Sequence, residues 1–259
     1  MFCGFVFSVF LTLFRNSCHL HNCYLLLLFI ALFAQEWEKL ANIVKGKVKV
    51  AYWDLDQQGQ VPSLLGEVLG TPTLRLYRPK PRDPHKQTAA SNAEKYVVDF
   101  NSRARLLKNM YDFVESQMPT FVEVVPFSEQ YPRKVQLKAG RYGLNHVVLF
   151  SKSEKMKITP TFKYLSTEFR WKLVVVQVPN TKKNEDLRKE FGLRAEDLPA
   201  LFVVKGGGGT AAPDDGQPER IRYQGTDFST PEFKGFLEEY ASKEEVYVPI
   251  EKPAVEVEL

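Results

Sequence analysis

The sequence predicts an α/β protein made of two similar units in tandem, each a mixed sheet flanked by helices. Three observations predict this class. From Trp37 onward, hydrophobic patterns with helical and strand periods alternate along the chain. The order of these patterns in the first half recurs in the second half. The length of 259 residues also suits two domains, since a domain has roughly 150 residues.

The first segment, residues 1–34, is an apolar leader that contains no Asp or Glu. Its two apolar runs, 5–14 and 24–34, are each about half as long as a bilayer-spanning helix. The second run resembles the core of a signal peptide, with Arg15 as the basic flank. Four interpretations stay open: a secretory leader, a membrane anchor, a buried core segment of the first domain, and a segment foreign to the natural protein.

The leader also contains a cluster of potential zinc ligands. Two cysteines and two histidines lie within the six residues from Cys18 to Cys23. Zinc sites usually take their four ligands as two separated pairs, which one short loop does not provide. We therefore expect no metal site here.

The first unit is predicted from residue 35 to residue 118. Trp37, Leu40 and Val44 recur at helical spacing, and Gly46 is a typical helix stop. The later patterns predict, in order, a strand at 47–56, a short helix at 62–69, a strand at 74–78, a loop at 79–93, a strand at 96–100 and a helix at 106–114.

The second unit is predicted from residue 119 to residue 243. Thr159-Pro160 marks a helix start, and Ser229-Thr230-Pro231-Glu232 has the pattern of a capping box. The periodicity predicts strands at 146–150, 172–178, 201–205 and 220–224, and helices at 160–169, 185–191 and 230–240. Residues 244–259 show no clear period, and we expect them to form a solvated tail.

Composition excludes several classes of protein. The chain is 44% hydrophobic and 25% charged, which is ordinary for a globular protein. Its net charge of +4 is too small and too evenly spread for nucleic-acid binding, so we expect no nucleic-acid partner. The run Gly206–Gly209 joins two predicted strands and lacks the Lys and Ser or Thr of a phosphate loop, so we expect no nucleotide and no cofactor.

Several motifs together resemble the thioredoxin fold, and specifically the protein disulfide isomerase family. Gly70-Thr71-Pro72-Thr73 follows a short helix, and Phe33 to Ala41 is similar to the helix after the redox motif. The second half resembles a redox-inactive thioredoxin-like domain at Val147 to Ser151 and at Leu198-Pro199-Ala200. The resemblance implies two tandem thioredoxin-like domains, of which the first is incomplete at its N-terminus.

The resemblance also implies where substrates bind. In the family, a cis peptide bond precedes the proline of the turn, and the backbone there contacts an extended substrate. It therefore implies substrate-binding residues at Thr71, Pro72 and Thr73. The matching turn of the second half adds Leu198 and Pro199 as a second surface.

The chain departs from the family at the redox motif. Family enzymes carry Cys-x-x-Cys at the start of the first helix, where the helix N-terminus activates the thiolate. Counting back from Trp37 places these two positions on Leu27 and Ile30, and the equivalent turn Ser151–Glu154 has no sulfur either. We therefore expect no catalytic residue in this chain.

The implied function is assistance to protein folding in the endoplasmic reticulum, by binding unfolded or nascent secretory proteins without redox chemistry. Two alternatives stay open: a truncated form of an active thiol-disulfide oxidoreductase or isomerase, and a membrane-tethered accessory subunit. The expected location is the lumen, or the membrane if the leader is not cleaved. The terminal Glu258-Leu259 shares only two positions with the Lys-Asp-Glu-Leu retention signal.

Overall fold

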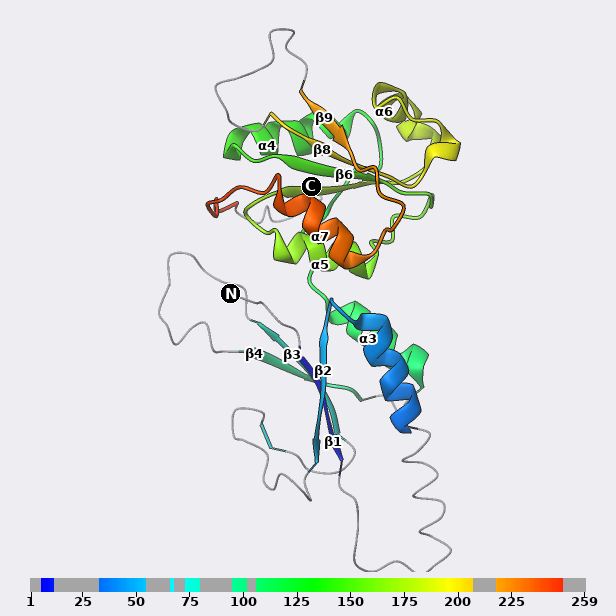
Figure 1. Ribbon diagram of the computed structural model, residues 1–259, viewed down its shortest axis with the longest axis vertical. Coiled ribbons are helices and arrows are strands. Elements are labelled where there is room, and N and C mark those ends of the chain that lie inside the picture. The colour runs from blue at the N-terminus through cyan, green and yellow to red at the C-terminus, as the bar shows by residue number, and fades with distance from the viewer. Residues whose placement is uncertain are drawn as a thin grey trace, which may run out of the picture. The chain divides into compact units, whose positions relative to one another are not determined.

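The computed structural model describes seven stretches of the chain (Figure 1): residues 6–11, 33–54, 66–67, 73–79, 95–101, 106–206 and 218–248. The chain divides into two compact units, Met1–Met118 and Pro119–Leu259.

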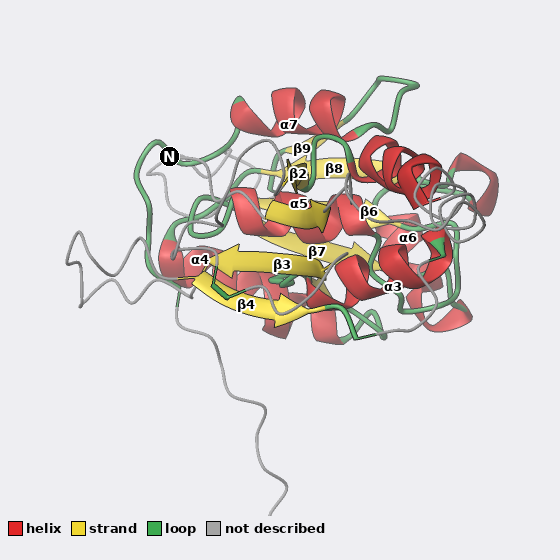
Figure 2. Ribbon diagram, turned by 90° about the horizontal axis from the view of Figure 1, so that it is seen from below, coloured by secondary structure: helices red, strands yellow, loops and turns green. Residues whose placement is uncertain are grey.

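The first unit contains a four-stranded mixed sheet in the order β2-β1-β3-β4. Its strands are β1 (Val6–Leu11), β2 (Lys49–Asp54), β3 (Thr73–Pro79) and β4 (Lys95–Asp99). β1 pairs parallel with β2 and antiparallel with β3. Figure 2 shows β3 and β4 side by side and antiparallel.

Two described helices belong to this unit, at residues 33–44 and at α3 (Leu107–Gln117). Gly46, with φ +78°, follows the first helix where the sequence predicts a stop. The first helix caps the second, because the Glu36 carboxylate accepts a 2.9 Å hydrogen bond from the backbone N–H of Leu107. An acidic group at a helix N-terminus satisfies a free donor and complements the helix dipole.

The second unit contains a five-stranded mixed sheet in the order β5-β7-β6-β8-β9. Its strands are β5 (Glu123–Val124), β6 (His146–Phe150), β7 (Val174–Val178), β8 (Ala200–Val204) and β9 (Arg220–Arg222). β5, β7 and β6 are parallel, whereas β8 pairs antiparallel with β6 and β9 pairs antiparallel with β8. Every residue of β6, β7 and β8 is buried, as in central strands covered on both faces.

Helices cover both faces of this second sheet. The α-helices are α4 (Leu137–Tyr142), α5 (Pro160–Glu168), α6 (Glu185–Glu190) and α7 (Thr230–Glu238). Shorter turns are a π-helix η3 (Pro132–Gln136) and the 3-10 helices η4 (Lys182–Asn184) and η5 (Ala195–Asp197). α5 and α7 lie on one face, and α4 and α6 on the other (Figure 1).

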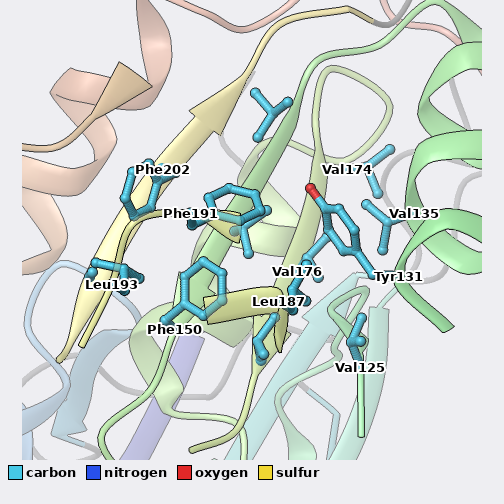
Figure 3. Packing of buried hydrophobic residues seen from close by; sticks show 14 of the residues in the cluster. Val125, Tyr131, Val135, Phe150, Val174, Val176, Leu187, Phe191, Leu193 and Phe202 are labelled. Atoms are coloured by element: carbon cyan, nitrogen blue, oxygen red, sulfur yellow. The ribbon is translucent and has the colours of Figure 1, made fainter. Parts of the chain in front are cut away.

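Aromatic rings fill the core on the α4 and α6 face (Figure 3). Phe191 makes edge-to-face contacts with Phe150 at 5.0 Å and with Phe202 at 5.2 Å between ring centroids. Such contacts add to the stabilisation from burial alone. On the other face, Phe162 of α5 packs on Phe233 of α7.

The strand order confirms the predicted fold class. In both sheets a pair of parallel strands is followed by two strands that each pair antiparallel with the strand before, so β2-β1-β3-β4 corresponds to β7-β6-β8-β9. The five-stranded sheet with two helices on each face is the thioredoxin-like arrangement expected of the second half. A counterpart of β5 is not among the described strands of the first unit.

The structure differs from the predicted leader at residues 6–11. These residues form β1, which lies between β2 and β3, with Val6 paired to Lys49 on one side and Tyr77 on the other. In the structure, residues 6–11 are therefore a strand of the first unit's sheet, and the four interpretations of residues 1–34 stay predictions. An apolar run of this length is compatible with a strand or with a signal core, and periodicity alone does not separate them.

The structure also differs from the predictions in three smaller ways. First, β5 and α4 have no counterpart among the predicted elements. Ser229 makes no cap hydrogen bond to α7; instead its hydroxyl and its N–H both bond the Asp227 carboxylate at 2.9 Å. Within the predicted tail, the N–H of Val246 bonds the Trp171 carbonyl at 2.8 Å, and Val246 and Val248 pack against the core.

Candidate functional site

The loops that follow β6 and β7 lie together at one edge of the second sheet, because parallel strands end at the same edge. The backbone N–H of Ser151 donates to the Val178 carbonyl at 2.9 Å, and that of Asn180 donates to the Ser153 carbonyl at 3.0 Å. The side chain of the buried Gln177 donates to the Lys157 carbonyl at 3.1 Å. These bonds hold the two loops in a fixed arrangement.

Pro199 lies at the same edge. The peptide bond between Leu198 and Pro199 is cis. Phe150 pairs with Ala200 across β6 and β8, which places Ser151 next to Pro199. Pro199 is exposed, whereas Leu198 is only 7% exposed and belongs to the core. Of the two residues predicted as a second surface, Pro199 alone presents its side chain to solvent.

The first predicted surface is described only in part. Thr71 and Pro72 lie outside the described residues, and so does the peptide bond between them. Thr73 is the first residue of β3, is half-buried, and pairs with Phe10 of β1. Thr73 belongs to the first unit and Pro199 to the second.

Arg75 of β3 forms hydrogen bonds to residues 66–67, the short described segment that precedes Thr71 in the chain. Its side chain is buried, and its Nε atom donates to the Asp99 carboxylate at 2.6 Å. Its Nη2 atom donates to the Glu67 carbonyl, also at 2.6 Å. One guanidinium thereby fixes residues 66–67 against β3.

The loop after β6 contains no nucleophilic sulfur. Its first hydroxyl, Ser151 Oγ, donates to the Ser153 carbonyl at 2.9 Å. The Ser153 hydroxyl in turn accepts from the Lys155 N–H at 3.1 Å. Both hydroxyls therefore shape the loop, and among the described residues neither is bonded to a carboxylate or an imidazole that would activate it.

The remaining sequence-predicted positions fall elsewhere. Leu27, Ile30, all three cysteines and Gly207–Gly209 lie outside the described residues. In the part of the chain that the structure describes, no three His, Cys, Asp or Glu side chains converge as a metal site would require. Within that same part, no helix is long and apolar enough to cross a membrane.

Sequence reasoning missed a buried polar pair at the other end of β6. His146 Nε2 lies 2.7 Å from the Tyr131 hydroxyl, and both side chains are buried. Burial, together with the nearby Arg220, lowers the pKa of His146 to about 4. Burial likewise raises the pKa of Tyr131. Both groups are neutral near pH 7, which suits a structural hydrogen bond better than proton transfer.

Comparison with known proteins gives matches only at the level of structure. No family model matches the chain, and no curated protein matches its sequence. Full-length ERdj5 is 14% identical with a TM-score of 0.47, over 92% of this chain and 29% of that one. The zinc-bound form of human ERp44 is 11% identical with a TM-score of 0.37, over 93% and 57%. The first two thioredoxin domains of Naumovozyma dairenensis Eps1p are 13% identical with a TM-score of 0.35, over 90% of both chains.

The matched structures are thioredoxin-domain proteins of the protein disulfide isomerase family. The chain spans less than a third of the length of ERdj5. At these identities a likeness concerns the fold alone, and the two strand orders establish that fold independently. The chain thus consists of two tandem thioredoxin-like units, similar in fold to proteins of that family.

Proposed function

We propose that this protein assists the folding of secretory proteins by binding unfolded or nascent chains without redox chemistry. The observation that carries the proposal is the exposed Pro199 beside Ser151, at the edge where redox members of the family carry a dithiol. The edge keeps the turn, and its two described loops contain no cysteine, so it offers binding and no thiol chemistry. Thr71, Pro72 and Thr73 are the proposed counterpart in the first unit.

The physical basis of binding is local. A client segment that meets the loop after β6 finds it already fixed by hydrogen bonds from Ser151, Asn180 and Gln177. A fixed surface loses little conformational entropy when it binds, so even a small contact area gives useful affinity. Leu198 supports Pro199 from the core side and is not itself the contact.

Site-specific crosslinking tests the proposal. A photo-crosslinking amino acid is placed at Pro199 or, as the matched control, at the exposed Arg141 of α4, near the other end of β6. Illumination with a chemically unfolded protein should give crosslinks at Pro199 and few at Arg141. The full chain should also suppress light scattering by that client. Equal crosslinking at the two positions would reject the surface.

The second candidate is thiol-disulfide exchange. It is favoured by one observation: β1 and the helix at 33–44 flank residues 12–32, which contain Cys18 and Cys23. The insulin reduction assay separates the candidates. Turnover that disappears when Cys3, Cys18 and Cys23 are replaced by Ser supports an oxidoreductase, whereas client binding that survives this replacement supports the first proposal.

Location in the endoplasmic reticulum is part of the same proposal. Microscopy of the tagged full chain, with protease protection of the isolated membranes, tests it. Mass spectrometry of the N-terminus of the mature protein then tests tethering. Removal of residues up to about Ala34 would exclude an uncleaved anchor and would also remove β1 from the first sheet.

A further inference from the structure

The edge that presents Pro199 also carries a concentration of positive charge. Five exposed lysines lie on its two loops: Lys152, Lys155, Lys157, Lys182 and Lys183. We refer to these five as the lysine rim. Glu154 is the only carboxylate in the two described loop segments 151–157 and 179–184. The whole chain carries only +4, so the rim is a local excess of charge.

The backbone beneath the rim is held in place. Asn180 binds the first loop twice, through its N–H to the Ser153 carbonyl at 3.0 Å and through its side-chain Nδ2 to the Lys152 carbonyl at 3.4 Å. At the other end of the second loop, the Lys183 carbonyl accepts from the Ser128 N–H at 3.2 Å. These bonds bring the lysines of both loops to one edge and keep them there.

Within the part of the chain that the structure describes, three of the five rim lysines have no carboxylate partner. Among the described residues, none forms an ion pair with Lys152, Lys155 or Lys182. The nearest carboxylate after η4, Glu185, is already paired with Lys189 at 2.8 Å. Lys183 lies over the Phe127 ring at 4.4 Å, a contact that keeps its charge. Several like charges held together attract an anionic partner.

Met156 indicates the kind of partner. It is 54% exposed and stands between Lys155 and Lys157. An exposed thioether is an adaptable apolar contact, typical of surfaces that bind varied peptides. A partner that matches both features has acidic and apolar side chains in alternation. An extended polypeptide provides this, since its alternate side chains point to opposite sides.

We propose that the lysine rim selects acidic segments of client polypeptides and holds them beside Pro199. The inference rests on the proposed function for its setting and adds the chemistry of the bound segment. Carboxylates of the client lie on the rim, and an apolar side chain lies on Met156. Nucleic acid and anionic membranes are rival partners that the experiment must separate.

Fluorescence anisotropy with the full chain provides the test. The probe is a labelled dodecapeptide in which Glu alternates with Ala and Leu, and its reference has Gln in place of every Glu. We expect the Glu peptide to bind the more tightly, and the difference to disappear in high salt because salt screens exposed charges. The double variant Lys152→Glu, Lys155→Glu should weaken binding of the Glu peptide about tenfold.

A matched variant controls for net charge. Arg133→Glu, Lys134→Glu makes the same change on η3, where both side chains are exposed. It should leave the affinity for the Glu peptide within about twofold. An equal loss of affinity for the Glu peptide in both variants would overturn the inference, because the net charge of the protein alone would then explain the binding. Tighter binding of a DNA oligonucleotide, or of phosphatidylserine vesicles, than of the Glu peptide would also overturn the inference.

The two proposals fail in different ways. Crosslinking from Pro199 to an unfolded client that has few carboxylates does not depend on the rim. If such crosslinks form while the Lys152, Lys155 variant binds the Glu peptide normally, the rim is wrong and the client surface stands. If the Glu peptide depends on the rim but no client crosslinks at Pro199, the rim stands as an anion-binding surface unrelated to clients.

Discussion

The buried His146 predicts that the second unit loses stability in mild acid. In the folded protein its pKa is about 4 because of burial and the charge of Arg220, whereas the ordinary value is 6.5. Below pH 6.5 the unfolded chain therefore binds more protons than the folded one. The contribution of His146 to stability is complete above pH 6.5 and is lost as the pH falls toward 4. One pKa unit corresponds to about 1.4 kcal/mol, so the loss from pH 7.5 to pH 5 is about 2 kcal/mol.

The described groups around His146 do not stabilise its protonated form. Tyr131 supplies a neutral hydroxyl, and Arg220 supplies a positive charge. The carboxylate that faces them, Glu190, is already paired with the Arg220 guanidinium. Protonation inside the fold would therefore place a second positive charge beside Arg220 in a buried position, which is costly.

Urea unfolding of the full chain at pH 7.5 and pH 5.0 measures this loss. Pulse-labelling hydrogen exchange on peptides from β6 follows the second unit separately from the first. The comparison variant is His146→Gln, which keeps an acceptor for the Tyr131 hydroxyl and does not titrate. We expect the loss between the two pH values to be about 2 kcal/mol larger in the original protein than in the variant. Equal losses would refute the assignment of a buried, neutral imidazole.

Three further predictions concern stability and use the same unfolding measurement. Leu165→Ala on α5, where the side chain is fully buried, should cost about 2–5 kcal/mol; Leu137→Ala, at a position that is 67% exposed, should change stability by no more than about 0.5 kcal/mol. Asn184→Ala removes the donor shared by the Val125 and Pro179 carbonyls at 3.0 Å and should cost about 1–3 kcal/mol. Asn180→Ala, at a half-buried position, should cost less, and the reverse order would contradict this reasoning. Arg75→Ala should destabilise the first unit more than Asp99→Ala, because Arg75 is buried and also binds Glu67 whereas Asp99 is half exposed. Hydrogen exchange in peptides from β3 measures the two losses of stability. Equal losses would show that only the ion pair with Asp99 contributes.

The sequence predicted most elements of the second unit because local and tertiary preferences agree there. β6 is an uninterrupted apolar run, and Thr159-Pro160 starts α5 with the Thr159 hydroxyl accepting from the Phe162 N–H at 3.4 Å. β5 was missed because two residues show no periodicity. α4 was missed because it follows a π-helical turn and six residues give little amphipathic signal. Ser229 was misjudged as a cap because Asp227, two residues before it, competes for the same hydroxyl.

The candidate site was harder to predict than the fold. Pro199 could be named from a resemblance, but its exposure depends on Leu198 turning inward to the core, which no local pattern specifies. The lysine rim comes from two loops about thirty residues apart in the chain, joined by Asn180. The pairing of Tyr131 with His146 joins the start of η3 to the start of β6, and a single histidine in an apolar strand gives no sign of its partner.

The loop after β6, beside Pro199, contains no cysteine, and this limits what kind of binding the edge can provide. A dithiol retains a client covalently until exchange releases it, whereas Ser151 cannot form that bond. Each exposed lysine contributes at most about 1 kcal/mol to a contact with a carboxylate. If the proposed function holds, several rim lysines must therefore contact one client segment at the same time to retain it. The resulting complex dissociates quickly, and its affinity falls as the salt concentration rises. Such a contact suits repeated capture and release of a folding chain, because no chemical step has to be reversed before the client folds.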